Sequence, residues 1–399
     1  MKKFGVVACL LFAIPIFSSP QASALDTANV AALFGRLTSE SVLANPSVVL
    51  IDNKTGEVVF EKNAYSLRKP ASVLKLYSAT AALTYLQPTQ RFTTSAWVGS
   101  QSKSIVIQGA LDPWFSLNDV QAKKMGRTSL PRIEFNSLKA LKSANPGSIR
   151  NSTIYYSDLY SQDVTNIKNF FLKHGVKATM KRVSYDDAQL LSATHILTSD
   201  SPELQEILAF TLTWSDNMLA ERIARLASRA AGHSLDDVGV AETFAEVLTG
   251  LGIENKNLVI RDASGLSKEN RVSATQVAQL LVKIRNDSRF APLIGGLPIG
   301  GMTGTLRHRF IDTAPQAIGL VKAKTGTLNG TANLAGYVEA GDREYIFVII
   351  ADKLKKSSSA ENRARATIDR ILGKIASPLL PEFLPVSGEV TSETVFTTA

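Results

Sequence analysis

Short alternating runs of apolar and polar residues lie at both ends of the chain, and helical periodicity lies between them. The stretch SVVLIDNKTGEVVFEKN (47–63) predicts two strands joined by a turn at Asn53–Gly56. A second hairpin is predicted over 91–110, and three more strands over 321–353. We therefore expect an α/β sandwich whose sheet combines strands from the N-terminal and C-terminal parts of the chain.

Helical patterns fill the regions between these strands. KPASVLKLYSATAALTYL (69–86) predicts a helix with one buried face. Residues 201–232 predict two helices separated by a break at Trp214–Asp216, and residues 359–375 a final amphipathic helix. The segment between 111 and 194 is less regular, because prolines such as Pro131 interrupt it.

The first 24 residues have the pattern of a secretory signal peptide. Lys2 and Lys3 precede an apolar stretch over 4–17, and Ala22–Ala24 offers a small-residue cleavage site. The stretch is shorter than the about 20 residues of a membrane-spanning helix, although an uncleaved anchor stays an alternative. We expect a protein secreted across the cytoplasmic membrane, into the periplasm or to the exterior of the cell wall.

Composition and charge narrow the possible chemistry. The 399 residues are 45% hydrophobic and 20% charged, which is typical of a globular chain of about two domains. Cys9 is the only cysteine and lies in the predicted signal peptide, so the mature chain would have no disulfide, thiol nucleophile or thiolate metal site. The four histidines are not in metal-ligand spacing, so we expect no metal and no cofactor.

A formal net charge of +9 is concentrated in the middle of the chain. Between residues 111 and 182 there are twelve Lys or Arg against five Asp or Glu. Such a segment suits an anionic polymer, and in a secreted protein this indicates the cell wall or a membrane surface before nucleic acid. The alternative is a solvated face that only aids solubility.

Three pairs of residues match Ser-x-x-Lys: Ser66/Lys69, Ser72/Lys75 and Ser100/Lys103. A lysine that deprotonates a serine must lie one helical turn from it. Lys69 precedes Pro70, which disfavours a helix there, and Ser100 falls in a hairpin turn. Only Ser72 and Lys75 lie at the start of an apolar helix, where backbone amides stabilise an anion and burial lowers the pKa of the lysine.

Two further motifs each occur more than once, and their context indicates which copy could carry chemistry. Ser-x-Asn occurs at 116–118, 143–145 and 215–217, and only Ser215-Asp216-Asn217 lies at a tight break between two helices. Lys-Thr-Gly occurs at 54–56, in the first hairpin turn, and at 324–326, on a predicted strand. On a strand, Gly326 lets a substrate backbone pass closely, and Lys324 and Thr325 offer donors to a carboxylate.

In this order, the motifs Ser-x-x-Lys, Ser-Asp-Asn and Lys-Thr-Gly are those of penicillin-binding proteins and class A β-lactamases. The chain resembles the low-molecular-mass penicillin-binding proteins of the D-alanyl-D-alanine carboxypeptidase/endopeptidase type, the peptidase S13 family. The resemblance covers about residues 45–113 and 196–375 and includes the blocks GALDP, RDASGLSKENRVSA, LPIGGMTGTLRHRF and KAKTGTLNGTANLAGYV. The chain departs from the family in the spacing of GALDP and in a shorter segment between Ser72 and Ser215.

The resemblance implies an α/β (α+β) fold, with an antiparallel sheet flanked by helices and an all-helical region that carries Ser215. It implies a discontinuous catalytic domain over 25–110 and 196–378, a basic inserted domain over 111–195, and a loosely ordered tail over 379–399.

The resemblance also implies a role for each motif residue in cutting the D-Ala-D-Ala bond of peptidoglycan stem peptides. Ser72 would be the nucleophile and Lys75 its base, while Ser215, Asn217 and Lys324 would complete the catalytic group. The substrate would bind to Thr325, Gly326 and Thr327, and the oxyanion to the backbone N–H groups of Ser72 and Thr327. β-Lactams would be covalent inhibitors. Thr305 lies in a family block but receives no role.

Three alternatives stay open. A β-lactamase has the same motifs, but a class A enzyme adds a glutamate that activates water, and no counterpart is evident in the sequence. An esterase or D-amino-acid amidase on this fold would use the same acyl transfer. A non-catalytic wall-binding protein would use the basic segment alone, which leaves the five catalytic candidates unexplained. Asp262 and Ser264 are interpreted as turn-forming residues.

Overall fold

The computed structural model describes residues 26–378. The predicted signal peptide (1–24) and the predicted tail (379–399) lie outside the described residues. Within 26–378, no helix has the length and apolar character needed to cross a membrane.

The first sheet combines strands from the two ends of the chain, as predicted. Its order is β2-β1-β10-β9-β8, and every neighbouring pair is antiparallel. Val48 of β1 pairs with Ile349 of β10, about three hundred residues later in the chain. The strands are β1 (Ser47–Asp52), β2 (Val58–Lys62), β8 (Val321–Leu328), β9 (Thr331–Ala340) and β10 (Arg343–Ala351).

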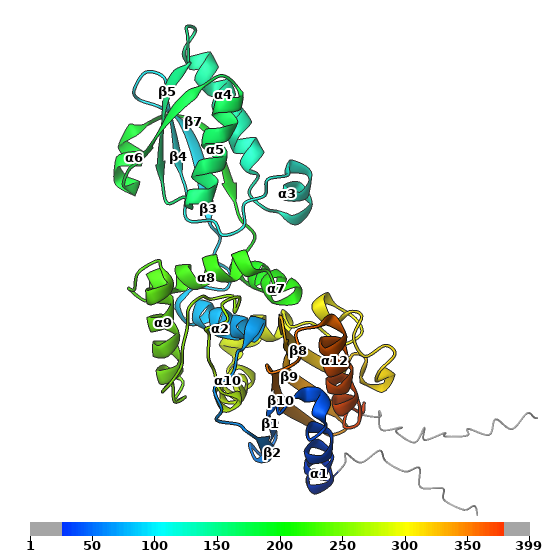
Figure 1. Ribbon diagram of the computed structural model, residues 1–399. Coiled ribbons are helices and arrows are strands. Elements are labelled where there is room, and N and C mark those ends of the chain that lie inside the picture. The colour runs from blue at the N-terminus through cyan, green and yellow to red at the C-terminus, as the bar shows by residue number, and fades with distance from the viewer. Residues whose placement is uncertain (1–25, 379–399) are drawn as a thin grey trace, which may run out of the picture.

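Helices cover both faces of this sheet, because its central strands are apolar on both sides (Figure 1). On one face, β-strand residues such as Leu50 and Phe347 pack against α1 and α12. On the other, Ile51 and Val348 pack against α2 and α10. The predicted α/β sandwich is confirmed. The covering helices are α1 (Thr27–Thr38), α2 (Lys75–Tyr85), α10 (Ala274–Asn286) and α12 (Ser358–Gly373).

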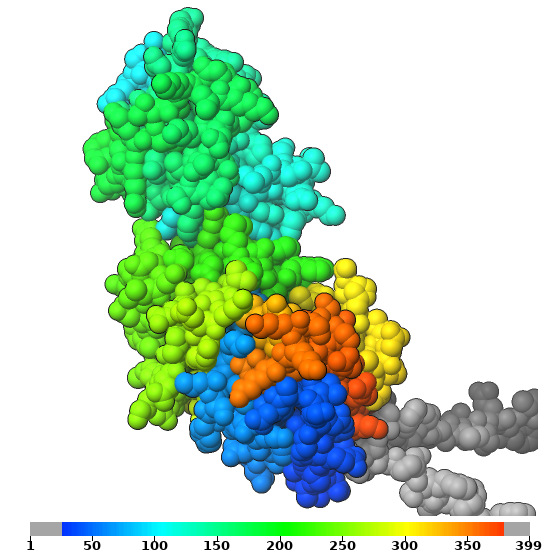
Figure 2. Space-filling view, in the orientation of Figure 1, coloured from blue at the N-terminus to red at the C-terminus, as the bar shows by residue number. Residues whose placement is uncertain are grey.

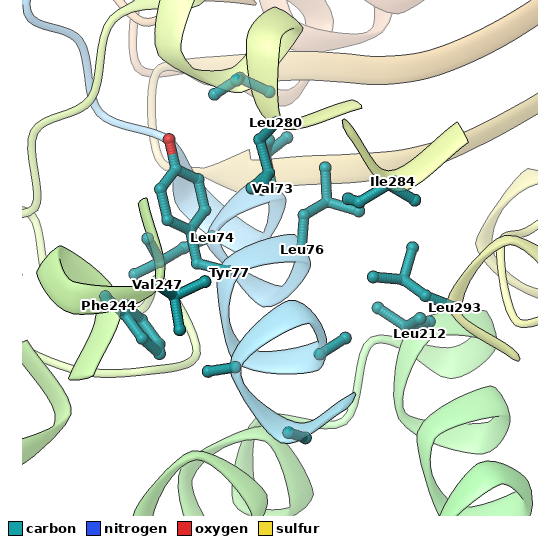
Figure 3. Close-up of a cluster of buried hydrophobic side chains, with 14 of the residues drawn as sticks. Val73, Leu74, Leu76, Tyr77, Leu212, Phe244, Val247, Leu280, Ile284 and Leu293 are labelled. Atoms are coloured by element: carbon teal, nitrogen blue, oxygen red, sulfur yellow. The ribbon is translucent and has the colours of Figure 1, made fainter. Parts of the chain in front are cut away.

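The helix α2 is the centre of the larger core. The short 3-10 turn η2 (Ala71–Leu74) leads directly into it, and nearly all of its residues are buried. Figure 3 shows Leu76 and Tyr77 among side chains of the surrounding helices, such as Phe244 and Leu293. Because neighbours enclose it, α2 is a rigid support for the residues at its start. The other helices here are α7 (Leu204–Trp214), α8 (Asn217–Ala230), α9 (Asp237–Gly250) and α11 (Ala291–Gly295).

Short 3-10 turns connect the remaining elements of this part of the structure. They are η1 (Ser41–Leu43), η3 (Ser288–Phe290), η4 (Gly304–Leu306) and η5 (Pro315–Ala317).

A second sheet, with its own core, forms a unit that projects beyond α7 and α8 (Figures 1 and 2). Its order is β6-β5-β4-β3-β7, with parallel pairing between β4, β5 and β6. Its strands are β3 (Thr93–Gly99), β4 (Ser104–Gln108), β5 (Asn151–Ser157), β6 (Lys177–Arg182) and β7 (Ser192–Asp200). Its helices are α3 (Asp119–Met125), α4 (Leu130–Ala144), α5 (Ser161–Lys173) and α6 (Tyr185–Leu191).

The second sheet extends past both limits of the predicted insert, 111–195. The predicted hairpin over 91–110 supplies two of its strands, β3 and β4, and β7 continues to Asp200. Pairing of β4 with β5 and of β3 with β7 places the hairpin at the centre of this sheet. The division into domains stays a prediction. The second sheet suggests Thr93 and Asp200 as the limits of the inserted domain.

Polar contacts join the second unit to helix α8. Arg222 is buried there and donates to Pro113 O at 3.3 Å, and it pairs with Asp163 at 3.2 Å. Its guanidinium also lies over the ring of Tyr160. Asp112 of the GALDP block is buried nearby, where burial raises its pKa to about 6. The block therefore lies at the junction of the two units.

Candidate active site

The backbone around Ser72 is held in an unusual conformation. Ala71, just before it, has a left-handed φ of +47°, which is costly for a residue with a Cβ. Asn333 Nδ2 on β9 donates to Pro70 O at 2.9 Å and so fixes the turn from one side. On the other side lies Gly265, where a Cβ would come within 1.9 Å of Ala71 O. The turn is thus clamped, and Ser72 has one defined position.

Lys75 lies one turn after Ser72 and directs its ammonium group back to it. Lys75 Nζ is 3.0 Å from Ser72 Oγ, 2.7 Å from Asn217 Oδ1 and 2.7 Å from Ser264 O. The side chain is fully buried, and burial lowers the pKa of Lys75 from 10.5 to about 8. A lysine with this pKa is partly neutral near pH 7 and can accept a proton from the serine hydroxyl.

A loop supported by two carboxylates carries the carbonyl that Lys75 contacts. Glu221 Oε1 on α8 accepts hydrogen bonds from the backbone N–H groups of Ala263 and Ser264, at 3.0 and 2.9 Å. Asp262 Oδ1 accepts from Gly265 N at 2.7 Å, as expected of a turn residue. Asp262 therefore holds the bend at residues 263–265, which agrees with its interpretation as a turn-forming residue. The contact of Ser264 O with Lys75 was not predicted.

Ser215-Asp216-Asn217 forms the predicted break between two helices. Ser215 ends α7 in the left-handed region, with φ of +60°, and the side chain of Asp216 accepts from Leu219 N at the start of α8. The outer residues of the motif therefore point to different lysines. Asn217 contacts Lys75, and Ser215 Oγ lies 2.9 Å from Lys324 Nζ.

The second Lys-Thr-Gly lies on strand β8, beside the turn that carries Ser72. Lys324 is fully buried, and burial together with the nearby charge of Lys75 lowers its pKa well below 10.5. A Cβ on Gly326 would lie only 2.7 Å from Pro70 O, so a side chain there would push the strand away from the turn. The glycine therefore permits the close approach of Thr325 and Thr327 to Ser72.

A cavity of about 450 Å³ opens over these residues. Lys75, Asn217 and Lys324 are not among its lining residues and lie behind the hydroxyls. Thr305 was left without a role, but its hydroxyl lies 2.9 Å from Thr325 Oγ1 at the cavity wall. The lining residues are Ser72, Ser215, Thr305, His308, Arg309, Thr325, Gly326, Thr327, Ala332, Asn333, Asn362, Arg365 and Ile368.

The other motif matches have structural roles elsewhere. Lys54-Thr55-Gly56 forms the predicted hairpin turn, with Gly56 at φ of +74°. The side chain of Asn118 caps α3, and Asn145 ends α4. In residues 26–378, no group of three or more His, Cys, Asp or Glu side chains could hold a metal ion.

The sequence profile of the D-Ala-D-Ala carboxypeptidase 3 (S13) family matches residues 30–188 and 153–375, which together cover most of the chain. The chain belongs to this family. The predicted resemblance to peptidase S13 is confirmed, and so is the prediction of a serine-type D-Ala-D-Ala carboxypeptidase. The family match also includes the whole segment between 113 and 196, which the sequence resemblance left out.

One curated protein and two solved structures illustrate what the chain is similar to. Carboxypeptidase DacB of Mycolicibacterium smegmatis is 28% identical over 391 residues, covering 84% of this chain and 82% of that protein. Penicillin-binding protein 4 of Haemophilus influenzae has the same fold, with a TM-score of 0.66 and 15% identity over 87% of this chain and 98% of that one. A predatory endopeptidase of Bdellovibrio bacteriovorus, acylated by penicillin G, matches with a TM-score of 0.55 and 17% identity over 83% of this chain and 93% of that one.

Proposed function

We propose that this carboxypeptidase works through an acyl-enzyme on Ser72. The observation that carries the proposal is the 3.0 Å contact between Ser72 Oγ and Lys75 Nζ, in a buried environment that lowers the pKa of the lysine. Neutral Lys75 takes the proton of Ser72 as Oγ attacks the carbonyl carbon of the penultimate D-alanine. Asn217 and Ser264 O hold the lysine nitrogen in place throughout.

The leaving amine requires a proton when the C–N bond breaks. Ser215 Oγ lies on the cavity wall and is hydrogen-bonded to Lys324, so a proton can pass from this pair to the amine. The backbone N–H groups of Ser72 and Thr327 are our candidates for the oxyanion hole, because both residues line the cavity. Water then hydrolyses the ester and restores the serine hydroxyl.

Strand β8 is the proposed binding edge for the substrate. Thr325 and Thr327 offer hydroxyls to the terminal carboxylate, whereas Gly326 keeps β8 close to Pro70 rather than leaving space for the stem peptide, as the sequence had suggested. Buried Lys324 adds positive character behind them when it is protonated. The same contacts would receive the carboxylate of a penicillin.

We further propose that β-lactams are covalent inhibitors and that the ester they form on Ser72 is hydrolysed slowly. No Asp or Glu lines the cavity within the described residues, so no carboxylate there is placed to activate the water that hydrolyses an acyl-enzyme. The penicillin G-acylated endopeptidase with this fold supports the same proposal, and it makes D,D-endopeptidase activity a second candidate function. The β-lactamase alternative is disfavoured on the same ground.

Secretion and wall contact are also proposals. The signal-like residues 1–24 support export, and the basic segment supports contact with anionic wall polymers. A non-catalytic wall-binding protein is disfavoured, because hydrogen bonds join Ser72 to Lys75, Lys75 to Asn217, and Ser215 to Lys324. An esterase or amidase would use the same residues and differ only in the acyl group.

The decisive experiment is the intact mass of residues 25–399 after mixing with a penicillin, beside Ser72→Ala. We expect a stable adduct on the wild type and none on the variant. Release of D-alanine from a D-Ala-D-Ala peptide then tests the substrate. Hydrolysed penicillin without an adduct would instead identify a β-lactamase. Intact penicillin without an adduct would contradict the proposed nucleophile.

A further inference from the structure

A depression of about 500 Å³ lies apart from the catalytic cavity and shares no lining residue with it. It is formed where the start of α12 meets η1 and the segment that follows β10. Figure 2 shows the N-terminal part of the chain (blue) beside the part around residue 350 (orange) at the surface. We call this feature the cationic depression. Its lining residues are Ser41, Val42, Ala44, Lys353, Leu354, Lys355, Ala360 and Arg363.

Three of the lining side chains are cationic and exposed, and none is acidic. The cations are Lys353, Lys355 and Arg363. Among residues 26–378, none of the three forms a salt bridge. The guanidinium of Arg363 donates only to a neutral hydroxyl, Ser359 Oγ, at 2.5 Å. All three charges therefore stay available to an anion.

The acidic residue in the first turn of α12 is directed away from the depression. Glu361 accepts a hydrogen bond from Gly330 N at 2.9 Å and pairs with Arg365 at 3.4 Å. The amino end of a helix carries a partial positive charge, and Ala360 places this end of α12 in the wall. The helix end therefore adds to the positive potential of the three cations.

The shape of the depression favours a polymer segment over a membrane surface. Its apolar residues are at least partly buried, and Leu354 is only 7% exposed. None of the large apolar side chains that are exposed within residues 26–378 lines it. A membrane-binding surface needs such side chains to enter the lipid, whereas a charged polymer needs cations along a groove. The depression has the cations and lacks the apolar anchors.

Helix α12 separates the depression from the catalytic cavity. Asn362 and Arg365 on α12 line the cavity, whereas Ala360 and Arg363 line the depression. Because these two pairs lie on different faces of one helix, about the 10 Å diameter of a helix separates the two sites. A polymer held in the depression would therefore lie next to the catalytic cavity.

We propose that the cationic depression binds a phosphodiester polymer of the cell envelope. A phosphodiester chain carries one negative charge at every repeat, so successive phosphates meet Lys353 and Lys355 as point charges. Arg363 adds a guanidinium contact, whose planar fork matches the oxygens of a phosphate. Such binding would hold a secreted enzyme beside its peptide substrate. The site is separate from the basic inserted segment, and its binding does not depend on the chemistry of Ser72.

Binding of a fluorescent oligomer of glycerol phosphate, measured by fluorescence anisotropy, tests the proposal. The depression variant combines Lys353→Gln, Lys355→Gln and Arg363→Gln. A matched control variant combines Lys54→Gln, Lys256→Gln and Lys283→Gln, which remove the same charge from three exposed lysines elsewhere on the surface. An oligomer of glutamate serves as a second probe, because it carries carboxylates in place of phosphates. Adduct formation with penicillin shows that each variant is folded.

At about 0.15 M salt, we expect Kd to rise about tenfold in the depression variant and less than about twofold in the control. The slope of log Kd against log salt is expected to fall by about two, as for the loss of three phosphate contacts. An unchanged Kd in the depression variant, or an equal rise in both variants, would overturn the site. Equal binding of the two oligomers would overturn the assignment to phosphate. No binding by a wild type that penicillin still acylates would overturn this inference and leave the role of Ser72 intact.

Discussion

Lys324 Nζ lies 2.9 Å from Ser215 Oγ, a contact that joins strand β8 to the break between α7 and α8. Lys75 and Ser72 form the same kind of pair between a lysine amine and a serine hydroxyl. Each hydroxyl is at the surface of the cavity, and each lysine is buried behind it. Because two buried ammonium groups repel each other, the arrangement favours a state in which at least one lysine is neutral.

The first prediction is that acylation by penicillin becomes faster as pH rises towards about 8. Only the neutral amine of Lys75 can accept the serine proton, and its pKa is lowered to about 8. Below this value the acylation rate constant is expected to rise about tenfold per pH unit, and above it to level off. Rapid-quench measurements with a fluorescent penicillin give the profile. Lys54→Ala, in the other Lys-Thr-Gly, is expected to keep it, and a flat profile in the wild type would contradict the role of Lys75.

The second prediction compares the glycines of the two Lys-Thr-Gly motifs. Gly56→Ala places a Cβ in open space at a left-handed φ, so it costs about 1 kcal/mol of stability and leaves acylation unchanged. Gly326→Ala places a Cβ 2.7 Å from Pro70 O and displaces the turn that carries Ser72. We expect it to slow acylation at least about a hundredfold. Urea unfolding and adduct formation would be measured on both variants, and similar acylation rates would show that β8 tolerates the shift.

The local geometry of the three motifs could be predicted from the sequence, because it depends on residues that are close together in the chain. Ser72 and Lys75 are one turn apart at the start of a helix, and Ser215 and Asn217 flank a residue that caps the next helix. Context also excluded the other matches, since Lys54 and Gly56 lie in a hairpin turn.

The supporting contacts could not be predicted, because they join residues far apart in the chain. Glu221 supports Ser264 from 43 residues away, and Asn333 fixes Pro70 from 263 residues away. The middle segment also proved more regular than predicted. Pro131 was interpreted as an interruption, but it lies in the first turn of α4, where the N–H that proline lacks is not needed.

The third prediction concerns Glu221, a positioning residue outside the cavity. Glu221→Ala removes the acceptor of two buried N–H groups in the loop that carries Ser264 O, which costs about 1–3 kcal/mol per unsatisfied group. We expect slower acylation, because Ser264 O no longer holds Lys75 in place. Glu221→Gln keeps an acceptor oxygen and is expected to restore most of the rate. A purely structural role would lower stability in Glu221→Ala while leaving the acylation rate of the folded protein unchanged.

The fourth prediction is a pH effect on stability from Asp112, at the junction of the two units. Burial raises its pKa to about 6, against the opposing effects of the hydrogen bond from Trp114 N and the charge of Arg222 and with a smaller rise from Asp163. The folded state therefore holds a proton on Asp112 in the window from about pH 4 to about pH 6, where the unfolded chain has released it. The contribution of Asp112 to the free energy of unfolding therefore falls as pH rises through this window, by about 3 kcal/mol in total.

Asp112→Asn keeps an oxygen to accept from Trp114 N but cannot ionise. We expect the free energy of unfolding of the variant not to fall across this window. Near pH 7 the variant is then more stable than the wild type, by about 2–3 kcal/mol. Urea unfolding at a series of pH values between about 4 and about 7 measures the difference. If the two proteins kept parallel stability profiles, Asp112 would have to be ionised in the folded state across the whole window. Arg222 would then neutralise it more fully than its contacts with Asp163 and Pro113 imply.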